Sequence, residues 1–184
     1  MPFDTAPDFR YGRMTLDNVS GPQGGSVQVP LRAEYWNGKS FVRNEDDSGS
    51  DFDASIYCVM SNVENSSAAL SSDPEGVESV VTGSSDIVNA EQANSQREMA
   101  RIFLRQGDDS IGMNSALPLP DATLNQTQCG DWSAKRDDDE QAQPWLQFNW
   151  RNLGDEDPST VVNFGAYRGN DRIIYRGEPN LIAY

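Results

Sequence analysis

The fold class is decided by residues 27–35, which read Val27-Gln28-Val29-Pro30-Leu31-Arg32-Ala33-Glu34-Tyr35. Every second side chain in this stretch is apolar or aromatic, and a period of two is typical of a β-strand with one buried face. Pro30 lies on the opposite face and cannot donate a backbone hydrogen bond, which indicates a sheet edge or a bulge. Asn37-Gly38 and then Phe41-Val42 follow, so the pattern predicts a β-hairpin over residues 27–43.

Similar strand patterns recur along the chain. The other segments with β-rich or alternating composition are Tyr11–Leu16, Ile56–Met60, Val77–Thr82, Met99–Leu104, Trp145–Trp150, Val161–Tyr167 and Arg172–Arg176. We expect a polar loop or a short helix over residues 90–98, and a hairpin over residues 167–175 that turns at Gly169-Asn170. Residues 106–143 contain few apolar side chains and are predicted to form long polar loops. Together these segments predict an all-β fold, an antiparallel β-sandwich of the Greek-key or jelly-roll kind.

The size and charge of the chain exclude several classes of protein. A length of 184 residues suits one domain with its own core, so residues 1–184 are expected to form a single domain, part of a larger surface protein. Fourteen basic and 29 acidic residues give a net charge of −15, which repels phosphate and argues against binding to nucleic acid or to an anionic membrane. The sequence has no histidine, which excludes Ser-His-Asp triads and histidine-ligated metal sites. No stretch is long and apolar enough to be a transmembrane segment, and the N-terminus does not resemble a signal peptide.

Acidic residues gather in three of the predicted loops, and carboxylate oxygens in loops suit Ca²⁺. The first group has the best spacing, because the alternate residues Asp51 and Asp53 can point to one side. The calcium candidates are therefore Asp46, Asp47, Asp51 and Asp53. The other groups lie at residues 137–140 and 155–157. None has the spacing of an EF-hand, so solvated loop charge is the favoured interpretation of each group and calcium binding is the alternative.

Tryptophans are the other candidates for a binding site. The four are Trp36, Trp132, Trp145 and Trp150. An exposed indole could serve as a stacking platform for a saccharide, but core packing is the expected role of most of them. Trp145 and Trp150 are an odd number of positions apart, so in a regular strand one would face the core and the other the solvent. We take Trp36 and Trp150 as the candidate ligand-binding residues. A pair of carboxylates would also suit a glycoside hydrolase.

Cys58 and Cys129 are the two cysteines of the chain, and they lack the CxxC spacing of a metal or redox site. The acidic, Ser/Asn-rich composition is typical of secreted proteins and favours a disulfide between them. Two independent buried thiols are the alternative.

Several motifs near the two ends of the sequence occur together in one known family. They are residues 11–16, residues 29–38 with Phe41-Val42, Asp46-Asp47-Ser48, residues 144–148, Asp157-Pro158-Ser159, Phe164-Gly165 and residues 167–175. In these motifs the chain resembles the C-terminal domain of the MshQ family, which is encoded with a bacterial type IV pilus, the mannose-sensitive haemagglutinin pilus. The resemblance implies an extracellular or cell-surface location in a bacterium. It also implies a role in adhesion or pilus assembly, with pilus proteins, other surface proteins or surface glycans as partners.

The chain departs from this family at two places. Family members often have a cysteine after the Asp-Asp-Ser motif, where this chain has Gly49. The difference argues against carrying the disulfide pattern of the family over to this chain. The loop at residues 151–154 is shorter than in the family and carries a positive charge, which argues against calcium at Asp155 and Asp157.

Three functions follow from these observations. The leading interpretation is a non-catalytic extracellular domain of a pilus-associated surface protein. The alternative is a carbohydrate-binding module with an exposed tryptophan platform, and the third is an enzyme that uses two carboxylates. The resemblance supplies no catalytic residue, and calcium is the one candidate cofactor.

Overall fold

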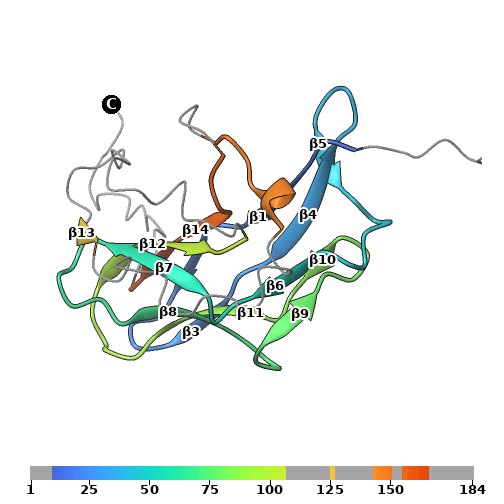
Figure 1. Ribbon diagram of the computed structural model, residues 1–184. Coiled ribbons are helices and arrows are strands. Elements are labelled where there is room, and N and C mark those ends of the chain that lie inside the picture. The colour runs from blue at the N-terminus through green and yellow to red at the C-terminus, as the bar shows by residue number, and fades with distance from the viewer. Residues whose placement is uncertain (1–9, 107–124, 127–142, 151–154, 166–184) are drawn as a thin grey trace, which may run out of the picture.

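A computed structural model describes residues 10–106, 125–126, 143–150 and 155–165 (Figure 1). In these residues nearly all regular structure is β, and the one helical element is the 3-10 turn η3 (Pro144–Leu146). The strands are β1 (Gly12–Leu16), β2 (Val19–Gly21), β3 (Ser26–Gln28), β4 (Leu31–Trp36), β5 (Phe41–Arg43), β6 (Asp51–Asp53), β7 (Tyr57–Ser61), β8 (Ala68–Ser72), β9 (Val77–Ser79), β10 (Ser84–Ser85), β11 (Val88–Gln92), β12 (Glu98–Leu104), β13 (Asn125–Gln126) and β14 (Ser159–Phe164). The predicted all-β class is confirmed.

The strands form two layers with a shared core. One layer is the sheet β13-β7-β12-β14-β2, and below it in Figure 1 lies the sheet β3-β11-β8. A third sheet, β1-β4-β10 with β5 also paired to β4, extends from these layers, and β6 pairs with β9. All of these pairs are antiparallel except β14 with β2. The arrangement is that of a β-sandwich, while the Greek-key or jelly-roll connectivity stays a prediction.

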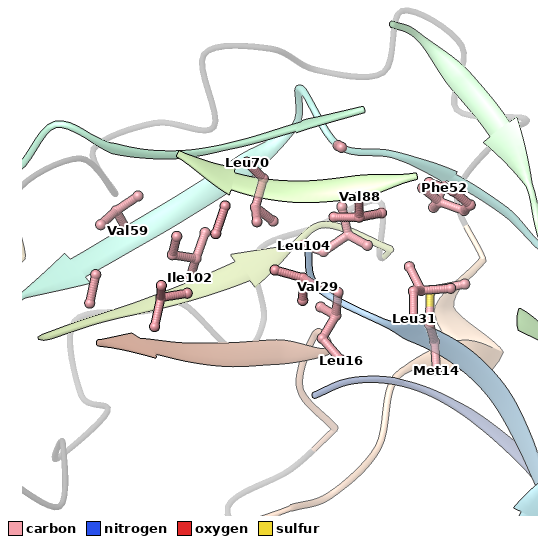
Figure 2. Close-up of a cluster of buried hydrophobic side chains, with 14 of the residues drawn as sticks. Met14, Leu16, Val29, Leu31, Phe52, Val59, Leu70, Val88, Ile102 and Leu104 are labelled. Carbon is pink, nitrogen blue, oxygen red and sulfur yellow. The ribbon is translucent and has the colours of Figure 1, made fainter. Parts of the chain in front are cut away.

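Apolar side chains from both layers meet in one core (Figure 2). Alternation along the strands sends these side chains inward. Figure 2 labels Met14, Leu16, Val29, Leu31, Phe52, Val59, Leu70, Val88, Ile102 and Leu104, all of them buried. Because the core takes the inner face of β1 and β4, the outer face of these two strands is left for other contacts.

The segment that predicted the fold crosses from one sheet to another. Residues 26–28 form β3, which pairs with β11, whereas residues 31–36 form β4, which pairs with β1. Pro30 lies at the break between the strands, where its missing N–H does not interrupt a ladder. The predicted single hairpin over residues 27–43 is therefore wrong in its first half, and its second half is the β4–β5 hairpin. The connection has four residues, Asn37 to Ser40, in place of a two-residue turn.

Two other local predictions have different outcomes. Residues 99–104 form a strand as predicted, but part of the expected loop or helix at residues 90–98 is β11. The strand predicted for residues 145–150 is wrong. Pro144 starts η3 instead, the amide of Leu146 donates to the Gln143 carbonyl at 2.9 Å, and Leu146 enters the core. Proline suits this position because its φ angle is already close to the helical value and no N–H is needed there.

The 143–150 segment lies across β1, and Figure 1 shows η3 beside β1 and β4. It is held at one end by the Gln143 amide, which donates to the carbonyl of Gln106 at 2.7 Å. At the other end Phe148 and Glu156 form a β-bridge. Apart from its end residues Gln106 and Gln143 and from β13, the predicted long loop at residues 106–143 lies outside the described residues, and so does the predicted hairpin at residues 167–175. Within the described residues, no helix is long and apolar enough to cross a membrane.

Candidate functional site

An aromatic surface covers the outer face of the β1–β4–β5 sheet. Cross-strand pairing sets Trp36 opposite Phe41, and the 143–150 segment brings two more rings to the same place. We define the aromatic ridge as Tyr11, Trp36, Phe41, Phe148 and Trp150. Three of these side chains are exposed, Tyr11 by 61%, Trp36 by 44% and Trp150 by 38%.

The rings of the ridge contact one another in sequence. Ring centroids are 5.4 Å apart for Trp36 and Phe41, 5.1 Å for Phe41 and Phe148, and 5.0 Å for Phe148 and Trp150, each pair with an edge-to-face tilt. Tyr11 lies 5.9 Å from Phe41 and 6.0 Å from Phe148. These separations and tilts are those that aromatic pairs prefer, so each ring helps to fix the position of the next.

The guanidinium group of Arg13 contacts three rings of the ridge. Its guanidinium carbon lies 3.8 Å from the Phe41 ring centroid, 4.4 Å from that of Trp150 and 5.0 Å from that of Phe148. The same guanidinium donates from Nε to Glu34 Oε2 at 2.8 Å. A cation over aromatic faces is attracted by the ring quadrupoles, and the carboxylate compensates its charge. Arg13 therefore ties the 143–150 segment to strands β1 and β4.

A ladder of opposite charges continues along this face. Arg13 and Glu34 are cross-strand neighbours, Arg32 Nε lies 3.5 Å from Glu34 Oε1, and Arg32 Nη1 donates to Asp17 Oδ2 at 2.8 Å. The hydrogen bond that Arg32 donates to Asp17 is the main cause that raises the pKa of Arg32 above its ordinary value, and partial burial opposes it. Arg32 thus stays charged, and Glu34 has a cation on either side.

A pocket of about 370 Å³ adjoins the ridge and shares Tyr11 with it. We call it the Tyr11 pocket. Aromatic side chains in its lining are Tyr11, Tyr35 and Trp145, and Trp145 is 66% exposed. Its polar and charged lining residues are Arg10, Glu34, Asn44, Asp47, Ser50, Gln147 and Asp155. The pocket is thus built by residues at the start of β1, by β4, by the loop after β5, by the 143–150 segment and by Asp155.

Comparison with known families identifies the domain. A family model described as DUF6701, fourth domain, matches residues 10–179. The chain belongs to the DUF6701 family. Neither the curated proteins nor the solved structures contain a match to it. The function of this DUF6701 domain is therefore inferred from its fold and its aromatic ridge.

The four calcium candidates are engaged separately in this DUF6701 domain. Asp46 pairs with Arg10 at 2.9 Å, and the Asp47 carboxylate accepts hydrogen bonds from the Gly49 and Ser50 amides at 3.1 and 2.9 Å. Asp51 Oδ1 accepts from the hydroxyl of Ser79, and Asp53 Oδ1 accepts from the amide and hydroxyl of Ser55. No group of three acidic or cysteine side chains that could hold a metal ion occurs in the described residues.

The other acidic groups are only partly described. Residues 137–140 lie outside the described residues. Asp155 is exposed beside the Tyr11 pocket, whereas Glu156 and Asp157 are buried. Asp157 Oδ1 accepts hydrogen bonds from the Gln106 amide and the Gln147 side chain, both at 2.9 Å, so it links the 143–150 segment to the residues that follow β12.

The two candidate tryptophans, Trp36 and Trp150, belong to the ridge, although 114 positions separate them in the sequence. The expectation that most indoles pack in the core is wrong for Trp36, Trp145 and Trp150, and Trp132 lies outside the described residues. Sequence reasoning missed Tyr11, Arg13, Phe41 and Phe148. The alternation of Tyr11 with Arg13 on one face of a strand was the available signal.

Cys58 is disulfide-bonded in β7. The one other cysteine of the chain, Cys129, lies outside the described residues, so the predicted pairing of Cys58 with Cys129 stays a prediction.

Proposed function

We propose that this DUF6701 domain is a non-catalytic extracellular domain of a pilus-associated bacterial surface protein, and that it acts in adhesion or pilus assembly through the aromatic ridge. The exposed ridge carries the proposal, because aromatic side chains that are fixed yet open to solvent are typical of binding surfaces. The motif resemblance to the MshQ family supports the location and the pilus association. The family description as a fourth domain supports membership of a larger protein.

The construction of the ridge favours binding without rearrangement. The rings are held by their neighbours and by Arg13, whose side chain is 18% exposed beside Glu34 at 12%. Side chains that are ordered before binding lose less conformational entropy when a partner covers them. A contact surface of this kind can therefore gain affinity from a modest number of residues.

The test is attachment of the full chain and its ridge variants to purified pili and to whole bacterial cells. Trp36→Ala and Trp150→Ala should each weaken attachment about tenfold or more, as expected for central aromatic contacts, and leave the thermal midpoint nearly unchanged. Val81→Ala is the control, because Val81 is an exposed apolar side chain in the connection between β9 and β10, outside the ridge. Attachment that survives both tryptophan changes would overturn the proposal.

A carbohydrate-binding module is the second candidate, and the shared ridge of Trp36 and Trp150 favours it specifically. Faces of exposed aromatic rings can stack on the apolar faces of sugar rings. A glycan array probed with the full chain separates the candidates. Binding to a defined saccharide that Trp36→Ala and Trp150→Ala abolish would favour the module over a protein contact.

A further inference from the structure

We propose that the Tyr11 pocket receives an arginine side chain of the partner protein. The inference rests on the proposed function, because it concerns the protein that the domain contacts in adhesion or assembly. Three observations carry it: the shape and lining of the pocket, two arginine sites within the domain that use the same chemistry, and the charges that remain uncompensated around the pocket.

The pocket has the size of a site for one side chain or a small molecule. Its volume of about 370 Å³ is near the lower end of the range for ligand pockets. Tyr11 and Trp145 are the two most exposed aromatic side chains in its lining. Tyr11 contacts Phe41 and Phe148 of the ridge, whereas the Trp145 ring has no aromatic or cation–π contact among the described residues. An extended, planar, partly apolar group would fit between such walls.

The domain already binds guanidinium groups with aromatic rings and a carboxylate. Arg13 stacks on Phe41 and Trp150 and pairs with Glu34 at 2.7 Å. Arg10, at the pocket itself, lies 4.5 Å above the Tyr35 ring and pairs with Asp46. Each site combines a ring face with a carboxylate, the geometry that guanidinium groups favour over ammonium groups. Trp145 and Asp155 offer the same combination in the lining of the pocket.

The charges around the pocket favour a cation from outside. Arg10 is compensated by Asp46, and Glu34 is compensated by Arg13 and Arg32. Asp47 accepts hydrogen bonds from neutral groups only, and no basic side chain of the described residues lies within ion-pair distance of Asp155. The Asp47 and Asp155 carboxylates in the lining thus have no cationic partner among the described residues. The net charge of −15 also attracts a basic partner over a longer range.

The experiment is an NMR titration of the isotope-labelled full chain with N-acetyl-arginine methylamide, which reads the indole N–H signal of Trp145. The matched neutral probe is N-acetyl-citrulline methylamide, which has nearly the same shape without the charge. The arginine probe should bind in the millimolar range, at least about fivefold more tightly than the citrulline probe, and should weaken as NaCl rises from about 50 to about 500 mM. Methyl α-glucopyranoside tests a sugar as the occupant.

Variants separate the pocket from the rest of the surface. Asp155→Asn and Trp145→Ala should each raise the dissociation constant of the arginine probe about threefold or more. The controls are Asp86→Asn, an exposed carboxylate outside the pocket lining, and Trp150→Ala, which alters the ridge; neither should change the constant.

Equal binding of the two amino-acid probes, binding of the glucoside instead, or no change at Trp145 would each overturn the inference. None of these results bears on attachment to pili or cells through Trp36 and Trp150. The inference and the proposed function can therefore fail independently.

Discussion

Arg13 is the residue on which the ridge depends, since it contacts three of the five rings and Glu34. Arg13→Met keeps much of the length of the side chain but removes the cation, and with it the hydrogen bond and the ion pair to Glu34. We expect the free energy of unfolding to fall by roughly 2 kcal/mol, because a half-buried carboxylate loses one partner and the rings lose their cation. Urea denaturation measures the change.

Arg13→Lys is the matched variant, because it retains the charge without the planar group that stacks and forks. Its loss of stability should lie between those of the wild-type chain and Arg13→Met. If Arg13→Met unfolds at the same urea concentration as the wild-type chain, Arg13 does not hold the ridge in place.

Two turn glycines with positive φ angles, Gly38 and Gly83, differ in the space around them. Gly83 has a φ angle of +73°, and a Cβ atom there would lie 2.2 Å from the carbonyl oxygen of Asn44. Gly38, in the β4–β5 connection, has a φ angle of +94° and nothing within 4 Å. At both positions an L-residue would have a strained backbone. Only at Gly83 would its Cβ atom also collide with the loop that lines the Tyr11 pocket.

We therefore expect Gly38→Ala to lower the free energy of unfolding by about 1 kcal/mol and Gly83→Ala by about 3 kcal/mol. Thermal and urea unfolding of the two variants compare these costs directly, with the Gly38 change as the internal control. Equal losses would show that the approach of Gly83 to Asn44 is not a close packing contact.

Strands were predictable where alternation and burial coincide. Leu31 and Ala33 alternate with Arg32 and Glu34 in the sequence, and the fold buries the first pair and leaves the second pair outside. The 143–150 segment shows the limit of this reasoning, because Trp145, Phe148 and Trp150 are aromatic yet mostly serve a surface. The residue pattern identifies apolar and aromatic side chains that form contacts, but it does not distinguish those of the core from those of the ridge.

At the scale of the whole molecule, the candidate site joins parts of the chain that are far apart in sequence. Residues 10–50 supply β1, β4, β5 and the following loop, and the 143–150 segment and Asp155 supply the remaining walls. Trp36 and Trp150 were predictable as single candidates from their residue type. Their common ridge was not predictable, because it depends on the path of the 143–150 segment across β1, and no local pattern encodes that path.

The disulfide of Cys58 yields a prediction about the intact chain. Cys58 is bonded, and Cys129 is the one other cysteine in the sequence. Thiol titration of the denatured, unreduced protein should find no free thiol, and a non-reducing gel should show a monomer. Two free thiols, or a dimer that reduction converts to monomer, would contradict the internal bridge.

The exposure of three of the four tryptophans gives the domain an optical property. Trp36 and Trp150 lie on the ridge and Trp145 lies in the lining of the pocket, so all three indoles contact solvent in the folded chain. Their ultraviolet emission is therefore determined by what covers this end of the molecule more than by the packing of the core. An occupant of the ridge or of the pocket would displace water from these rings and change the native tryptophan fluorescence, so its binding could be followed without any attached dye.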